Sequence, residues 1–252
     1  MSKISAVIIT YNESANIARC ISSLKNVVDE VIVSDSNSTD ETKNIAEHLG
    51  AKVFIRNFEG YGATKNLANY QATNDWILSI DADEELDEHL ADNITRIKKH
   101  LEKNTVYECQ RLNNYCGKWI KHGGWYPDKK VRLFNKQHVK WDLAEVHETL
   151  EIPEQYNKQL LNGKLLHYSY NSVAGHTSKL EKYSTRGAEE AFKKGKKSSW
   201  VKLYLSPAFR FIRDYILKLG FLDGKYGFII AKLTAKEVYL KYKKLKLLHY
   251  IA

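Results

Sequence analysis

The sequence has few cysteines and no apolar run long enough to span a membrane. Cys20, Cys109 and Cys116 are far apart and form no CxxC pair, which argues against a disulfide framework or a zinc site and favours a reducing compartment. No apolar run approaches the roughly 18 residues that a membrane-spanning helix requires. Met1-Ser2-Lys3 leads directly into a strand-like segment, so we expect no signal peptide and a cytoplasmic protein.

The common phosphate-binding motifs are also missing. GxGxxG does not follow the first predicted strand, and GxxxxGK[ST] occurs nowhere in the sequence. These absences exclude a Rossmann dinucleotide site and a P-loop. The sequence also contains no internal repeat and no low-complexity segment.

The charge is unevenly distributed along the 252 residues, a length sufficient for one α/β domain and an appendage. Up to about Glu190 acidic and basic residues nearly balance. From Phe192 onward there are 15 Lys and Arg residues against Asp214, Asp223 and Glu237. This asymmetry predicts a C-terminal region that seeks an anionic surface, either lipid or nucleic acid.

Strand-like and helix-like segments alternate over the first hundred residues. The expected strands are apolar and rich in β-branched residues, and they cover residues 4–10, 30–33, 52–55 and 75–80. Amphipathic helices between them predict a parallel sheet with crossover connections. A helix over 87–103 is then followed by expected strands at 106–114, 130–135 and 160–168, and by helices from about residue 178.

Four carboxylates, Asp81, Asp83, Glu84 and Glu85, follow the fourth expected strand, at the end where open α/β sheets bind ligands. On an extended backbone the side chains of Asp81 and Asp83 point to the same side, so both can face one Mg²⁺ or Mn²⁺ ion. The alternative is a solvated acidic turn before the next helix, because acidic residues favour helix N-termini.

The first two expected strands also end in polar residues, at Thr10-Tyr11-Asn12-Glu13 and Asp35-Ser36-Asn37-Ser38. In a doubly wound sheet these two ends lie side by side and form one crevice. An acid at the end of the second strand suits a ribose or a base edge, while Asp81 and Asp83 suit a pyrophosphate through a metal ion. The pattern predicts a site for a nucleoside diphosphate and not for NAD.

Three segments in this order resemble the N-terminal half of a family 2 glycosyltransferase of the GT-A fold: Val7–Glu13, Asp29–Thr42 and Asp81–Glu84. Further on, Tyr126–Phe134 and Val146–Glu148 are similar to the branch that contains lipopolysaccharide-core β-glucosyltransferases. The resemblance implies a Rossmann-like GT-A domain over residues 1–190 with a mixed, mostly parallel sheet. Its nucleotide-sugar half covers 1–103 and its acceptor half 104–190, and a basic amphipathic helical tail covers 191–252.

The resemblance also implies a UDP-sugar site at the polar ends of the first two strands. The residues that we expect on the uridine side are Thr10, Tyr11, Glu13 and Asp35. Lys65 would flank the nucleotide as a positive charge, although a lysine on a solvated helix face is the alternative.

On the phosphate side of this site, Asp83 would bind a divalent cation, Mg²⁺ or Mn²⁺, and Asp81 the sugar or ribose hydroxyls. Several GT-A enzymes use a late histidine as a further metal ligand, a role that His167 could take. The alternative for His167 is a half-buried histidine that is hydrogen-bonded to the backbone. Arg132 could meet the diphosphate or an anionic acceptor group.

Inverting glycosyl transfer needs a carboxylate that acts as general base on the acceptor hydroxyl. Glu148, in the matching Val-His-Glu motif, is the expected base, with Glu145 as the reserve. The sequence lacks the Glu-Asp pair that many relatives have at this position. Aromatic residues between 115 and 141 offer a platform for an acceptor saccharide or belong to the core.

We therefore expect an inverting, metal-dependent glycosyltransferase that moves a sugar from a UDP-sugar, such as UDP-glucose, to a saccharide or lipid-linked saccharide in lipopolysaccharide or other cell-surface glycan synthesis. The basic amphipathic tail suits an anionic surface on the inner face of the cytoplasmic membrane, or else forms a helical cap. A sugar-nucleotide nucleotidyltransferase lacks support without a Gly-rich phosphate loop. Nucleic-acid binding is disfavoured because the basic residues lie in a hydrophobic tail.

Overall fold

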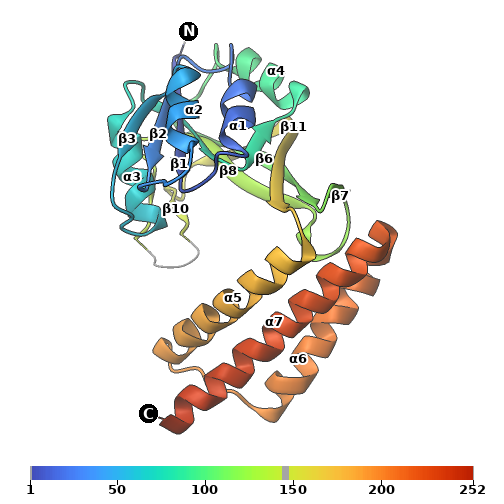
Figure 1. Ribbon diagram of the computed structural model, residues 1–252. Coiled ribbons are helices and arrows are strands. Elements are labelled where there is room, and N and C mark those ends of the chain that lie inside the picture. The colour runs from blue at the N-terminus through green and yellow to red at the C-terminus, as the bar shows by residue number, and fades with distance from the viewer. Residues whose placement is uncertain (1, 144–147, 252) are drawn as a thin grey trace. The chain divides into compact units, whose positions relative to one another are not determined.

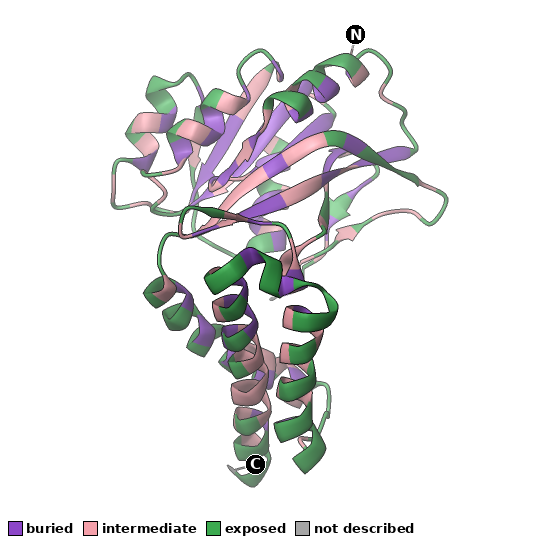
Figure 2. Ribbon diagram, turned by 90° about the vertical axis from the view of Figure 1, so that its right-hand side faces the viewer, coloured by how far each residue is buried: buried purple, intermediate pink, exposed green. Residues whose placement is uncertain are grey.

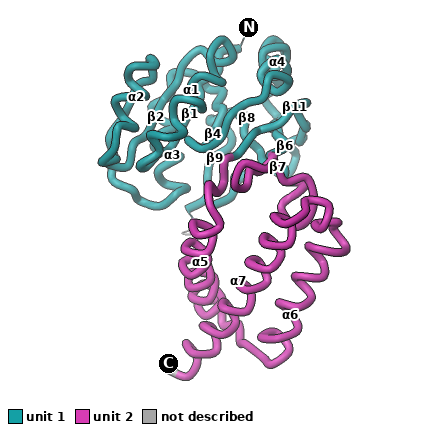
Figure 3. Tube along the Cα trace, turned by 45° about the vertical axis from the view of Figure 1, so that its right-hand side comes forward, with its two compact units in different colours: residues 1–111, 128–167 teal, residues 112–127, 168–252 magenta. Residues whose placement is uncertain are grey.

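The computed structural model describes residues 2–143 and 148–251, and the chain forms two compact units (Figure 3). Unit 1 comprises Met1–Arg111 and Asp128–His167, and unit 2 comprises Leu112–Pro127 and Tyr168–Ala252. These units meet in the sequence after residues 111, 127 and 167, and the predicted domain boundary between residues 190 and 191 stays a prediction.

Unit 1 begins with the alternating strands and helices that the sequence predicts (Figure 1). Its parallel strands are β1 (Ile4–Thr10), β2 (Glu30–Asp35), β3 (Lys52–Ile55) and β4 (Trp76–Asp81). The helices between them are α1 (Ile17–Ser23), α2 (Thr42–His48) and α3 (Tyr61–Gln71). Apolar, β-branched residues dominate β1 and leave it almost entirely buried, as expected for a central parallel strand.

The chain then adds β5 (Glu84–Leu86), α4 (Glu88–Ile97), β6 (Thr105–Tyr115), β7 (Lys118–Ile120), β8 (Asp128–Asn135) and β11 (Asn157–Tyr170). In this rest of the sheet, β8 pairs antiparallel with β4 and β6, β7 pairs antiparallel with β6, and β5 pairs antiparallel with β11. The sheet order is β3-β2-β1-β4-β8-β6-β11-β5, with β7 paired to β6. A short separate ribbon joins β9 (Lys140–Trp141) to β10 (Leu150–Glu151). The predicted mixed sheet is confirmed.

Helices cover both faces of this sheet. On one face, residues of α1, α2 and α4 pack with the strands, among them Ile17, Ala46 and Leu90. On the other face, Ala68 of α3 packs with Ile77, Phe134 and Trp141. The carboxyl ends of β1, β2 and β4 therefore sit on a rigid, buried support.

Unit 2 is mostly helical. Its α-helices are α5 (Val173–Lys193), α6 (Trp200–Ile212) and α7 (Gly224–Ile251). The 3-10 turn η1 (Gly123–Trp125) precedes them, and the π-helical η2 (Arg213–Leu217) and the 3-10 turn η3 (Gly220–Asp223) connect α6 to α7. Ile230 of α7 packs against Tyr115 and Ile120, and Leu245 packs against Ala188 and Ala191 of α5. The C-terminal residues are therefore part of the core of unit 2.

Within residues 2–143 and 148–251, none of the helices is both long enough and apolar enough to pass through a membrane.

Candidate active site

The polar loops that follow β1 and β2 are hydrogen-bonded to each other. The backbone N of Asn12 donates to Ser38 Oγ at 2.9 Å, and the backbone N of Thr39 donates to Asn12 Oδ1 at 2.8 Å. Asn12 has a φ of +54°, in the left-handed region that Asn tolerates better than most residues. The predicted crevice between the two strand ends is thus held by side-chain contacts.

Two buried oxygens at these strand ends have no hydrogen-bond partner in the described part of the chain. Thr10 and Asp35 are neighbours in the parallel register, and both are buried. Asp35 Oδ1 accepts from the backbone N of Ser38 at 2.8 Å, whereas Asp35 Oδ2 and Thr10 Oγ1 have no hydrogen-bond partner among the described residues. Because buried polar atoms are normally hydrogen-bonded, this pair indicates a place for a ligand with donor groups.

The other two residues predicted on the uridine side lie in the loop that follows β1. Tyr11 directly follows β1 and has an exposed ring. Glu13 lies in the loop before α1, where its backbone O accepts from the backbone N of Ile17 and its Oε2 accepts from Asn16 Nδ2 at 2.7 Å. The roles of both residues in nucleotide binding stay predictions.

Asp81 and Asp83 do not share one side of an extended strand, so that part of the prediction is wrong. β4 ends at Asp81, and the chain turns at Ala82 and Asp83 before β5 begins. The turn directs the two carboxylates to different partners. Asp81 pairs with Lys65 and Arg132, and Asp83 pairs with His167.

Asp81 is held between two cations. Lys65 Nζ lies 3.4 Å from Asp81 Oδ1, and Arg132 Nη2 donates to Asp81 Oδ2 at 2.7 Å. Burial raises the pKa of Asp81, but the charges of Arg132 and Lys65 outweigh it and hold that pKa well below its usual range. Asp81 is therefore ionised at any physiological pH.

Glu84 is a component of the site that the sequence did not reveal. Its side chain is 0% exposed, and Glu84 Oε2 accepts from the backbone N of Asp81 at 3.0 Å. Glu84 Oε1 accepts from Arg132 Nη2 at 2.5 Å and from Arg111 Nη1 at 3.4 Å. The acidic-turn alternative assigned Glu84 to a solvated helix start, and the burial of Glu84 excludes that.

Arg132 and Arg111 surround the buried glutamate. Arg111 also binds Asp128, with its Nε 2.8 Å from Asp128 Oδ2. The signal for this network was an arginine within the apolar run Val131-Arg132-Leu133-Phe134, since a buried arginine requires a carboxylate. Arg132 is buried and engaged by Asp81 and Glu84, so it positions Asp81. Its predicted contact with the diphosphate or an anionic acceptor group stays a prediction.

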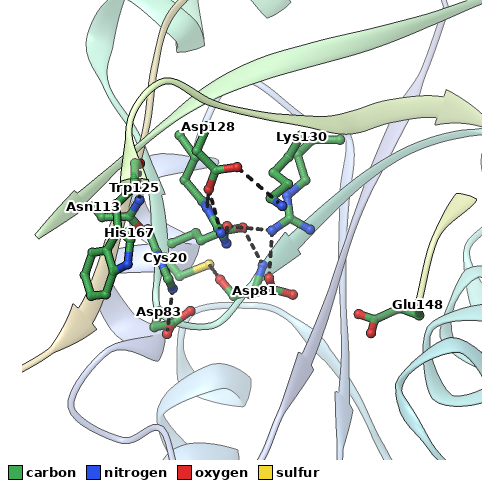
Figure 4. Close-up of polar contacts among 12 residues, drawn as sticks. Cys20, Asp81, Asp83, Asn113, Trp125, Asp128, Lys130, Glu148 and His167 are labelled. Carbon is green, nitrogen blue, oxygen red and sulfur yellow. Dashed lines mark hydrogen bonds and ion pairs between the residues drawn. The ribbon is translucent and has the colours of Figure 1, made fainter. Parts of the chain in front are cut away.

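Asp83 and His167 form a second pair at the same turn (Figure 4). His167 Nε2 lies 3.2 Å from Asp83 Oδ2, and His167 is opposite Glu84 in the antiparallel pairing of β11 with β5. One carboxylate oxygen and one imidazole nitrogen suit Mn²⁺, and both side chains are partly exposed. In the described part of the chain no group of three or more His, Cys, Asp and Glu residues could hold a metal ion. A cation at this pair would therefore take its other ligands from substrate and water.

Lys65 links Asp81 to the predicted base. Its Nζ lies 2.9 Å from Glu148 Oε1, besides the contact with Asp81, and 4.3 Å from the centre of the Trp141 ring. Lys65 is only 4% exposed, so the alternative of a lysine on a solvated helix face is wrong. In Figure 4, Asp81 lies between Glu148 and the pair formed by Asp83 and His167.

The segment that carries Glu148 is fixed to α3. Asn66 Nδ2 donates to the Trp141 backbone O at 2.8 Å, and Asn66 Oδ1 accepts from the Trp141 backbone N at 2.9 Å. Thr149, next to Glu148, donates from its backbone N and Oγ1 to the carboxylate of Asp142. Glu145, the reserve base, lies outside the described residues.

The aromatic residues of the middle region divide between core and surface. Tyr115 and Trp141 are buried in hydrophobic clusters, which removes both from any acceptor platform. Trp119, Trp125 and Tyr126 are partly exposed. An acceptor role for these three stays a prediction.

The model of the family described as "Glycosyl transferase family 2" matches residues 5–184. The chain belongs to glycosyltransferase family 2. The mixed sheet with helices on both faces is the Rossmann-like GT-A fold that the sequence predicted.

Several relatives resemble this glycosyltransferase along most of its length. An uncharacterized glycosyltransferase of Rickettsia typhi is 36% identical over 256 residues, which cover 98% of this chain and 87% of the relative. The lipopolysaccharide core biosynthesis glycosyltransferase LpsC of Rhizobium meliloti is 29% identical over 252 residues, which cover 95% of this chain and 93% of LpsC.

Among solved structures, the glycosyltransferase is similar over part of its length to glucosyl-3-phosphoglycerate synthase of Mycobacterium tuberculosis in complex with Mn²⁺, UDP and glucosyl-3-phosphoglycerate. The sequence identity is 25%, the TM-score is 0.37, and the match covers 45% of this chain and 44% of the synthase.

Proposed function

We propose that this glycosyltransferase moves a sugar, with inversion at its anomeric carbon, from a UDP-sugar such as UDP-glucose to a saccharide acceptor. The observation that carries the proposal is the position of Lys65, whose Nζ contacts Asp81 at the end of β4 and Glu148 on the loop before β10. This contact brings the carboxylate predicted to meet the donor sugar close to the carboxylate predicted to act as base.

The crevice between β1 and β2 supports binding of the nucleoside. Asp35 Oδ2 and Thr10 Oγ1 are buried oxygens that find no hydrogen-bond partner within residues 2–143 and 148–251, and a uracil N–H or a ribose hydroxyl would satisfy them. The exposed ring of Tyr11 lies next to Thr10 and would cover the base.

The pair formed by Asp83 and His167 supports a divalent cation, Mn²⁺ or Mg²⁺, as cofactor. These two residues would hold the cation at the turn after β4, and the cation supplies charge stabilisation for the departing diphosphate. The other acids at this turn are already paired, since Asp81 and Glu84 both accept from Arg132. Asp83 is therefore the carboxylate best placed to serve a metal ion.

Glu148 is proposed as the general base that removes the proton of the acceptor hydroxyl. The ammonium of Lys65, 2.9 Å away, orients one oxygen of Glu148. The hydrogen bonds from Thr149 to the carboxylate of Asp142 hold the residue that follows Glu148. A base held in this way has the fixed position that proton transfer requires.

The acceptor is proposed to be a saccharide, free or lipid-linked, in lipopolysaccharide or other cell-surface glycan synthesis. The support is the similarity to LpsC, whose name assigns it to lipopolysaccharide core biosynthesis. A lipid-linked acceptor also agrees with peripheral association with the inner face of the cytoplasmic membrane. Nucleic acid has no part in the proposed reaction.

The test is donor selection with the full chain. UDP-glucose, other UDP-sugars and GDP-sugars are compared by thermal stabilisation and by hydrolysis, with Mn²⁺, with Mg²⁺ and with a chelator. We expect stabilisation by a UDP-sugar that the chelator removes. Stabilisation by GDP-sugars alone would contradict the UDP-sugar as donor. Stabilisation that persists with the chelator would contradict the requirement for a divalent cation.

A further inference from the structure

The helix α6 and the following η2 present two apolar sides, and one of them is covered within unit 2. Leu203, Pro207 and Phe211 face α7 across a groove of about 480 Å³. Ring contacts bridge the same two helices, from Tyr204 to Tyr239 and from Phe211 to Phe228. This side explains part of the apolar content of α6.

The second apolar side is largely exposed to solvent. Leu205 and Phe209 on this side also line a groove against α7, and Ile212 borders the first groove. We call it the α6 apolar face, and it consists of Val201, Leu205, Phe209, Ile212 and Ile216. The intervals of four, four, three and four residues place these side chains along one side of a helix. Each of them is 45–61% exposed, and Figure 2 shows α6 as largely exposed. An apolar stripe of this length on a helix surface marks an interaction site.

The charged residues around the α6 apolar face have one sign at the surface. In the described segment 200–228, the charged side chains that reach solvent are Lys202, Arg210, Arg213, Lys218 and Lys225. The two acids of the segment are buried. Asp214 accepts from both Arg210 and Arg213, and Asp223 accepts from the backbone N–H groups of Lys121 and His122.

We propose that the α6 apolar face is a docking surface for an anionic phospholipid bilayer. The apolar side chains would enter the interfacial region, and the neighbouring lysines would meet lipid phosphates. A second copy of the chain fits less well, because a symmetric contact places each patch against itself and brings the basic residues together. This inference deepens the membrane part of the proposed function and rests on it, but it does not depend on the donor or the base.

The experiment compares two double variants of the full chain. Leu205→Ser with Phe209→Ser removes the centre of the α6 apolar face, at positions 53% and 61% exposed. The matched control, Leu49→Ser with Tyr70→Ser, removes exposed apolar side chains from unit 1, at positions 40% and 82% exposed. Because all four side chains are at the surface, we expect both proteins to fold. The wild type and both double variants are each sedimented with phosphatidylglycerol vesicles and with phosphatidylcholine vesicles, at low and high salt.

We expect the wild type and the control to bind the anionic vesicles, with less binding at high salt. The Leu205→Ser/Phe209→Ser variant should bind roughly tenfold more weakly, because its apolar contribution is lost. Absence of wild-type binding to anionic vesicles, or equal binding by both variants, would overturn the proposal. The proposal would also be overturned if the wild type formed a dimer in the absence of vesicles and the Leu205→Ser/Phe209→Ser variant were a monomer. UDP binding measured on the same proteins separates this outcome from a failure of the donor assignment.

Discussion

Lys65 Nζ lies 2.9 Å from Glu148 Oε1, although 83 positions separate the two residues in the sequence. The same ammonium lies 3.4 Å from Asp81 Oδ1. One buried cation therefore neutralises carboxylates from two distant parts of the chain, and a change at either carboxylate also changes the surroundings of the other.

Glu148→Gln is expected to keep donor binding and to lower transfer by about two or more orders of magnitude, because general-base catalysis contributes about that much. Single-turnover transfer and calorimetric UDP binding measure the two effects. Glu151→Gln is the matched control, since Glu151 is exposed and forms an ion pair with the exposed Lys140. Transfer near the wild-type rate would exclude Glu148 as the base, and an equal loss in Glu145→Gln alone would move the role to Glu145.

Asp83→Asn is expected to abolish cation-dependent UDP binding while the circular dichroism spectrum stays unchanged. Asp83 is proposed to hold the cation together with His167, which lies 3.2 Å away, so His167→Ala should weaken the response to Mn²⁺ as well. Calorimetry with UDP and Mn²⁺ is the measurement, and Asp92→Asn, at an exposed position on α4, is the control. Unchanged affinity in Asp83→Asn would mean that the metal site lies elsewhere.

Glu84→Gln is expected to lower the free energy of unfolding by about 3 kcal/mol, because it removes one partner of a buried ion pair. Its neighbour Glu85 pairs with Arg19 at 3.5 Å in a partly exposed position, so Glu85→Gln should cost less than about 1 kcal/mol. Urea unfolding of the two variants makes the comparison. Similar costs for both would show that the contacts of Glu84 with Arg132 and Arg111 do not stabilise the fold.

Asp81→Asn is expected to have an effect on stability that depends on pH. The charges of Arg132 and Lys65 keep the pKa of Asp81 below its usual value in the folded state. The stabilisation is therefore fully present above the unfolded-state pKa of about 4 and is lost as the pH falls towards the folded-state value. The difference in unfolding free energy between wild type and Asp81→Asn should be constant from about pH 7 to about pH 5 and narrow below about pH 4. A difference that does not change with pH would contradict the pairing of Asp81.

Local patterns in the sequence were sufficient for the nucleotide half of unit 1. The apolar runs that form β1 and β4 are short-range signals, and the structure places these two strands as predicted, although the chain turns after Asp81, so that Asp83 lies on a turn and not on an extended strand. Asp87, at the start of the helix predicted from residue 87, caps α4 by accepting from the backbone N of Leu90.

Those local patterns could not predict contacts between residues that are far apart in the sequence. Glu84 and Arg132 are 48 positions apart, and nothing near Glu84 in the sequence distinguishes it from the solvated acids that follow. In the same way, the packing of Ile230 against Tyr115 depends on contacts between distant segments of unit 2. The basic tail was therefore predicted as an appendage, although its helix α7 completes a core.

Gly62 sets the distance between α3 and the loop that carries Glu148. A Cβ atom at Gly62 would lie 1.8 Å from the Asp142 backbone O, which leaves no room for any side chain. A Gly62→Ala substitution would push Asp142 away from α3, and we expect it to increase the distance from Glu148 to Lys65 and to the donor. Residue 62 is thus a spacer, and we expect the proposed catalysis by Glu148 to depend on a residue to which we assign no contact with either substrate.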